Sequence, residues 1–161
     1  YGAQDEFGHY VKARPRDGEV QAALARASLP CGDRAGALAA YRNACERLLE
    51  DAQRGRAEAV YVEAARAFDE FVLGAGTHLD LAFGLERNLK PAAALKAYES
   101  FARVYEGHTE AAFALLRAAN IHTRGGRLDR ARFCYEQLVS RYPQSEWAEF
   151  ATEHARRLAA S

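Results

Sequence analysis

Two stretches of the sequence repeat one pattern of large and small residues at a fixed spacing. Residues 98–113 read YESFARVYEGHTEAAF, and residues 135–150 read YEQLVSRYPQSEWAEF. Matching positions lie 37 residues apart, namely Tyr98 with Tyr135, Glu99 with Glu136, Tyr105 with Tyr142, Ala111 with Ala148 and Phe113 with Phe150. Self-similarity at such a period indicates stacked copies of one small structural unit, because a single unit cannot bury its own apolar face.

The centre of the pattern is an alanine followed four residues later by an aromatic residue. It occurs at Ala3–Phe7, Ala37–Tyr41, Ala57–Tyr61, Ala94–Tyr98 and Ala131–Tyr135. A further large apolar residue follows most of these tyrosines by seven positions, and offsets of 0, 4 and 11 fall on one face of a helix. Tyr61 and Tyr98 keep the 37-residue spacing, but Tyr41 and Tyr61 are only 20 residues apart. The pattern therefore predicts helices throughout, with one irregular step.

A second pattern of small residues precedes three of these helices by twelve or thirteen positions, as in Leu81-Ala82 and Ala118-Ala119. Short segments separate the two patterns: PCGD at 30–33, NLKP at 88–91 and RGGR at 124–127. Glycine permits the left-handed end of a helix, and proline suits the first turn of the next one. Each unit is therefore predicted to be a helix, a tight turn and a second helix.

The best-preserved unit resembles the tetratricopeptide repeat (TPR). It combines Ala118-Ala119, the run GRLDRA at 126–131, Tyr135, and Pro143 eight residues later. The run YPQSEWAEFA is similar to variant TPRs of bacterial envelope and scaffold proteins. The resemblance implies an all-α fold of antiparallel helical hairpins stacked as a right-handed solenoid.

On this reading the whole chain, residues 1–161, forms a single repeat domain. Helices are expected at 3–13, 18–29, 33–52, 56–72, 77–88, 91–106, 109–124, 128–141 and 146–160. Residues 1–15 would be the tail of a truncated repeat, 18–52 a repeat, 56–72 a distorted repeat helix, 77–106 and 109–141 two further repeats, and 146–160 a terminal capping helix. The long helix 33–52 is expected to close one repeat and open the next.

Composition favours a soluble helical domain and excludes several classes. Formal net charge is +0, so no bulk attraction to nucleic acid or anionic membrane is expected. The basic stretch from Arg117 to Arg132 is short and interrupted by Asp129. No apolar run is long enough to span a bilayer. The chain has no methionine, which suggests a fragment or processed form whose missing part could tether it to a membrane. A cytoplasmic location is favoured over a periplasmic one.

No motif predicts catalysis, a metal or a cofactor. The five histidines form no HExxH pattern, and the three cysteines form no CxxC pair. No GxSxG elbow is present, and the glycine-rich segments follow no strand. His122 is expected to be a packed histidine and Cys45 a small core residue.

The resemblance places the first helix of each hairpin on a concave, ligand-binding face. The positions carried over are Arg26, Phe83, Glu86, Arg87, Leu116, Asn120, Arg124, Glu153 and Arg157. Arg87 and Arg124 lie one period apart and are expected to form a ladder. Guanidinium groups suit carboxylates, and Phe83 and Leu116 could form an apolar floor. Solvated surface arginines are the alternative interpretation.

These observations favour a non-catalytic scaffold that binds a peptide or partner protein on the concave face. One alternative is a structural or oligomerisation module whose end helix, with Trp147 and Phe150, pairs with a second copy. Another is the soluble regulatory tail of a larger bacterial membrane protein, such as a rhomboid-like intramembrane protease.

Overall fold

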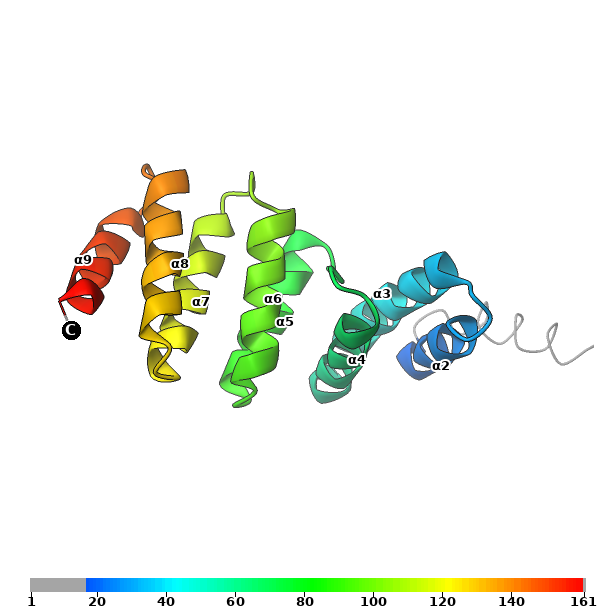
Figure 1. Cartoon of the computed structure of the whole chain (residues 1–161). Coiled ribbons are helices and arrows are strands. Elements are labelled where there is room, and N and C mark those ends of the chain that lie inside the picture. Colours follow the sequence, from blue (N-terminus) through cyan, green and yellow to red (C-terminus); the bar gives the residue numbers. More distant parts are fainter. Residues whose placement is uncertain (1–16, 161) are drawn as a thin grey trace, which may run out of the picture. The chain divides into compact units, whose positions relative to one another are not determined.

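The computed structural model describes residues 17–160, and this part of the chain contains eight α-helices and no strand (Figure 1). The helices are α2 (Gly18–Ser28), α3 (Arg34–Glu50), α4 (Arg54–Ala67), α5 (Ala75–Arg87), α6 (Pro91–Val104), α7 (Ala111–Arg124), α8 (Leu128–Arg141) and α9 (Ala148–Ala159). The all-α prediction is confirmed. The helix expected at 3–13, which includes Ala3–Phe7, lies outside the described residues.

The helices belong to two compact units, the first ending at Leu73 and the second beginning at Gly74. In the first unit α2 and α3 form a hairpin with a close approach at Gly18. A Cβ at this position would lie 2.4 Å from Cγ of Leu48, so a side chain here would force the two helices apart. Asp17 and Asp33 cap the two helices through hydrogen bonds from the Val20 and Gly36 amides.

Helix α4 lies one full period beyond α2. Arg26 on α2 pairs with Glu63 on α4 at 2.9 Å, and Glu19 pairs with Arg56 at 3.1 Å. Both pairs join residues 37 positions apart. Helix α4 therefore corresponds to a first helix, although its Ala57–Tyr61 pattern is that of a second helix. The long helix α3 packs against both α2 and α4, and its expected role of opening the next repeat stays a prediction.

The expected helix 56–72 ends early, at Ala67, because Phe68 adopts an extended conformation. The following segment is not helical, yet Phe71, Val72 and Leu73 are buried. The Phe71 ring packs against Tyr41 and Tyr61. This apolar segment fills the space beside α3 and α4, and no second helix follows α4 before α5 begins.

The second unit consists of two hairpins, α5–α6 and α7–α8, followed by the single helix α9 (Figure 1). Ala94, Tyr98 and Ala131 are fully buried, and Tyr135 is 1% exposed. The repeated alanines and tyrosines are thus core residues, as predicted: the alanines allow close helix approach and the rings fill the space between helices. The handedness of the stack and the assignment of one domain to the whole chain stay predictions.

The two connections between repeats in this unit share one geometry. The His108 amide donates to the Tyr105 carbonyl at 2.9 Å, and the Ser145 amide donates to the Tyr142 carbonyl at 3.0 Å. Each turn then caps itself, because Nδ1 of His108 and Oγ of Ser145 accept a hydrogen bond from the amide two residues later. These turns delay the helices, so α7 and α9 begin two residues after the predicted starts at 109 and 146.

Helix α9 covers the end of the last hairpin with aromatic side chains. Trp147 lies 5.8 Å from the Phe113 ring, and Phe150 lies 6.5 Å from the Tyr135 ring. Phe150 also stacks on His154 at 3.8 Å. Trp147 and Phe150 therefore contact the last hairpin, while Phe150 keeps 43% exposure, and the capping role stays a prediction.

Candidate functional site

A buried carboxylate links three helices on the predicted concave side of the second unit. Glu86 on α5 accepts a hydrogen bond from Nε of Arg117 at 3.0 Å, and a second one from Nη2 of the same residue. Nη2 of Arg124 lies 2.7 Å from Oε2 of Glu86, and the Tyr98 hydroxyl donates to Oε1 at 3.1 Å. Only 7% of the Glu86 side chain is exposed. The network ties α5 to α6 and α7.

The surroundings of Glu86 keep it ionised. Burial alone would raise the pKa of its carboxyl, but hydrogen bonds from Arg117 and Arg124 outweigh burial and lower the pKa below its ordinary value. The pKa of the Tyr98 hydroxyl is raised, by burial and then by the neighbouring Glu86 charge. Both groups hold their neutral-pH charge states, which suits a structural network rather than proton transfer.

The predicted ladder of Arg87 and Arg124 takes a different form. Arg124 donates a hydrogen bond to Glu86, so its guanidinium does not form a ladder with that of Arg87. The Arg87 guanidinium lies over the Phe83 ring on its own helix, 5.9 Å from the centroid. Phe83 is 42% exposed, so Arg87 and Phe83 together present a cationic and aromatic surface.

Each of the remaining predicted partner-binding positions is either buried or already contacts another side chain. Leu116 is 5% exposed and therefore offers almost no floor to a ligand. Asn120 accepts a hydrogen bond from the Tyr135 hydroxyl at 2.6 Å. Arg157 pairs with Glu153 within α9 at 3.3 Å. Arg26 lies in the first unit, where it pairs with Glu63.

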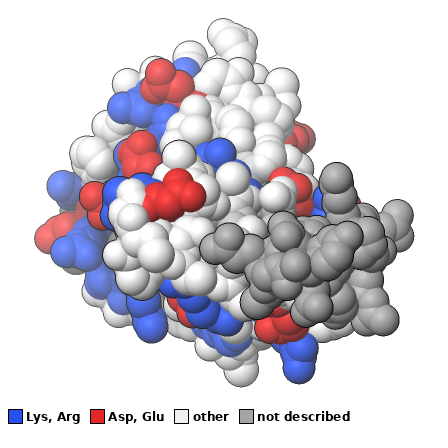
Figure 2. All heavy atoms as spheres, turned by 90° about the vertical axis from the view of Figure 1, so that its right-hand side faces the viewer, with Lys and Arg blue, Asp and Glu red and all other residues white. Residues whose placement is uncertain are grey.

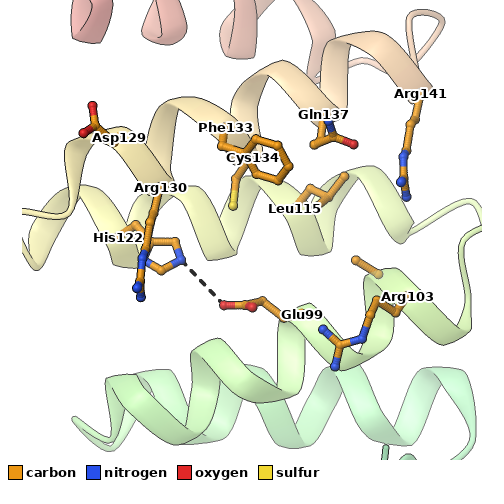
Figure 3. Close-up of a pocket in the computed structure, with 11 residues that line it drawn as sticks. Glu99, Arg103, Leu115, His122, Asp129, Arg130, Phe133, Cys134, Gln137 and Arg141 are labelled. Carbon is orange, nitrogen blue, oxygen red and sulfur yellow. Dashed lines mark ion pairs between the residues drawn. The ribbon is translucent and has the colours of Figure 1, made fainter.

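A groove of about 550 Å³ lies between α6 and α8 over α7 (Figure 3). Its apolar part includes Ala102, Leu115, Phe133 and Cys134. Sequence reasoning missed this groove. The available signal was Phe133, a large apolar residue that is not one of the core positions Ala131 and Tyr135. The equivalent position one repeat period earlier is the polar Lys96.

His122 occupies one end of the groove as a buried, neutral acceptor. Nε of Arg127 donates to its Nδ1 at 2.9 Å, and its Nε2 lies 3.5 Å from Glu99 (Figure 3). Burial lowers the His122 pKa, against the opposing effect of Glu99, and the positive charges of Arg127 and Arg130 lower it further. The packed role predicted for His122 agrees with its 4% exposure.

The buried thiols have no activating neighbour that would offset their burial. Burial raises the pKa of Cys134 to about 11 and that of Cys45 to about 12. Within residues 17–160, no group of three or more histidine, cysteine or acidic side chains is placed to hold a metal ion.

Charges of both signs are interspersed on the face drawn in Figure 2, where acidic side chains stand beside basic ones. Such a surface creates no large field of a single sign. No helix in the described part of the chain combines the length and the apolar character that crossing a membrane requires.

Paired antiparallel helices, a repeated alanine and tyrosine core, and repeated connecting turns define the chain as a helical repeat protein. Residues 113–145 match the family described as tetratricopeptide repeat. The matched residues comprise most of α7, all of α8 and the turn that follows, so this hairpin is the part of the chain that is similar to a tetratricopeptide repeat. No curated protein matches the chain. Tetratricopeptide repeats generally mediate contacts between proteins and are generally not enzymes.

Proposed function

We propose that this chain is a non-catalytic scaffold that holds a peptide or partner protein against the α5 and α7 surface of its second unit. The observation that carries the proposal is the exposed pair of Phe83 and Arg87. An aromatic ring beneath a guanidinium offers apolar contact area and hydrogen-bond donors at the same place. Aromatic and arginine side chains are the types that most often dominate binding energy at protein interfaces.

The Glu86 network supports this surface without occupying it. Glu86 orders Arg117 and Arg124, so their guanidinium groups lose less conformational entropy when a ligand arrives. Arg124 keeps 62% of its side chain exposed, and a guanidinium with one partner still has further N–H donors. An acidic group of the partner would therefore find donors from Arg87 and Arg124 on this face.

Two other roles have weaker support. Pairing of two copies through α9 would use aromatic surface that is already partly covered, because Trp147 packs against Phe113 and Phe150 packs against Tyr135 while keeping 43% exposure. The role of a regulatory tail on a larger membrane protein, including a rhomboid-like protease, stays a prediction from the sequence resemblance. Neither role is favoured by a specific contact in the described residues.

The test is comparative capture of partners by the purified chain and a double variant, Phe83→Ala with Arg87→Glu. Both side chains are exposed, so folding should be retained, which circular dichroism checks. Reversal at Arg124 is avoided because it would place a second carboxylate beside that of Glu86. Arg66→Glu, an exposed charge reversal on α4, is the matched control.

We expect the double variant to lose partners that the wild-type chain and Arg66→Glu both retain. The captured partners are crosslinked and identified by mass spectrometry, so that the partner lists of the three proteins can be compared. Identical partner lists for all three proteins would refute binding at the α5 and α7 surface.

A further inference from the structure

We propose that the groove between α6 and α8 is a second docking surface, which binds an acidic peptide segment carrying one large apolar side chain. The groove lies on the opposite side of α7 from the proposed α5 and α7 surface. Leu115 and His122 line it, and they are seven residues apart on one helix face. Asn120 and Arg124 project from the other face of the same helix. At about 100° of rotation per residue, Asn120 points about 140° away from Leu115, and Arg124 points about 160° away from His122.

The apolar part of the groove has an exposed anchor point. Phe133 is 60% exposed, more than either Phe83 or Phe150. Beside it Leu115 is half-buried, and Ala102 and Cys134 are buried beneath. A single exposed phenylalanine on a convex surface is ordinary. Here the ring stands inside a concave surface, where a partner's apolar side chain would lose water from several sides at once.

The charges of the groove differ between its two ends. At one end Glu99 points toward His122, and Asp129 and Arg130 stand nearby (Figure 3). This end holds both of the carboxylates that line the groove. At the other end Arg103 from α6 and Arg141 from α8 both stand beside the cavity (Figure 3). The arginine end therefore complements a carboxylate, and the apolar centre complements the side chain next to it.

The two arginines remain suitable donors even where they have other contacts. A guanidinium presents five N–H groups, so a partner on one edge leaves donors on another. Both side chains are exposed, and a carboxylate bridging them would accept charge-assisted hydrogen bonds from two helices. Gln137 lies between Phe133 and Arg141 on α8 and can bind the backbone of a peptide in the groove.

The ligand is therefore a linear segment with an aspartate or glutamate a few residues from a leucine, isoleucine or phenylalanine. This inference does not rest on the α5 and α7 surface, because no residue is shared between the two. A chain that fails to bind at Phe83 and Arg87 could still bind at Phe133 and Arg141, and the reverse also holds.

The test starts with selection of a display library of random linear peptides on the purified chain. We expect enrichment of peptides that combine acidic and large apolar residues. A synthetic copy of the most enriched peptide is then titrated by fluorescence anisotropy against wild type, Phe133→Ala, Arg103→Ala with Arg141→Ala, and Phe83→Ala as the matched aromatic control. Thermal unfolding followed by Trp147 fluorescence checks that each variant is folded.

The two groove variants should each weaken binding by about tenfold or more, whereas Phe83→Ala should leave it unchanged. Added salt should also weaken binding of the wild type, because exposed carboxylate contacts are screened. Absence of enrichment, enrichment of basic peptides, or binding that survives the groove substitutions would overturn the proposal. Loss of binding in Phe83→Ala alone would place the peptide on the other surface and overturn it as well.

Discussion

Removing the charge of Glu86 tests whether its network stabilises the second unit. Glu86→Gln keeps the shape of the side chain and an oxygen that can accept from Tyr98, but it removes the carboxylate from two arginines. Arg117 is the partly buried partner, with 25% of its side chain exposed against 7% for Glu86. Arg124 is 62% exposed, so water screens its pair.

The expected cost follows from these exposures. Breaking a fully buried ion pair costs about 3–5 kcal/mol, and the partial exposure of Arg117 reduces this to about 2 kcal/mol. The exposed Arg124 pair contributes about 0.5 kcal/mol. We therefore expect a loss of about 2–3 kcal/mol in the free energy of unfolding. For a unit of this size that corresponds to a fall of about 10–20 °C in melting temperature.

The assay is thermal unfolding followed by tryptophan fluorescence, since Trp147 is the chain's single tryptophan and lies in the second unit. Glu153→Gln is the matched control, because Glu153 also contacts two arginines, Arg156 and Arg157, but in exposed pairs. The control should change the free energy of unfolding by less than about 1 kcal/mol.

The pH dependence gives a second readout with a definite sign. The folded-state pKa of Glu86 is lowered, so its stabilising contribution is complete above the ordinary carboxyl pKa of about 4.3 and is lost as the pH falls through the lowered value. Glu86→Gln cannot titrate, so the difference between wild type and variant should narrow in acid. Two results would refute this account of the network. One is a decrease in melting temperature smaller than about 3 °C, and the other is a stability difference between wild type and Glu86→Gln that stays constant in acid.

Three further outcomes are expected. Tyr135→Ala should lower the free energy of unfolding by about 3–5 kcal/mol, because the ring is 1% exposed and its removal leaves a cavity; an unchanged denaturation midpoint would contradict the stacking assignment. Gly126→Ala should lower the free energy of unfolding in urea by about 1–2 kcal/mol, since Gly126 has φ +76° and only backbone strain opposes the new methyl group. An unchanged free energy of unfolding would contradict the strain argument. A thiol reagent at neutral pH should label the exposed Cys31 quickly, while Cys45 and Cys134 should react only after denaturation. If mass spectrometry detected fast labelling of all three cysteines, the burial of Cys45 and Cys134 would be contradicted.

The repeated core was predictable from the sequence because its chemistry is local. An alanine and a tyrosine four residues apart face the same side of a helix whatever surrounds them. The turn between paired helices was also readable, although it does not depend on glycine alone. Leu89 takes the left-handed conformation at φ +58°, one period before Gly126 at φ +76°.

The irregular step in the first unit shows where pattern reading stops. Ala57–Tyr61 has the spacing of a second helix, yet α4 pairs with α2 as a first helix through Arg56 and Glu63. Both helix types bury small residues, as Ala82 on α5 and Ala94 on α6 show. The pattern therefore predicts burial of a face without deciding which neighbour covers it.

The sequence by itself determined that the chain is helical and which alanines and tyrosines form the core. Only the tertiary structure decided what the polar residues do. It assigned Arg124 to Glu86, covered Leu116, and left Phe133 exposed in a groove between α6 and α8. The physical reason is range: helical periodicity acts over a few residues, whereas the partner of a long charged side chain is chosen among residues that folding brings together from other helices.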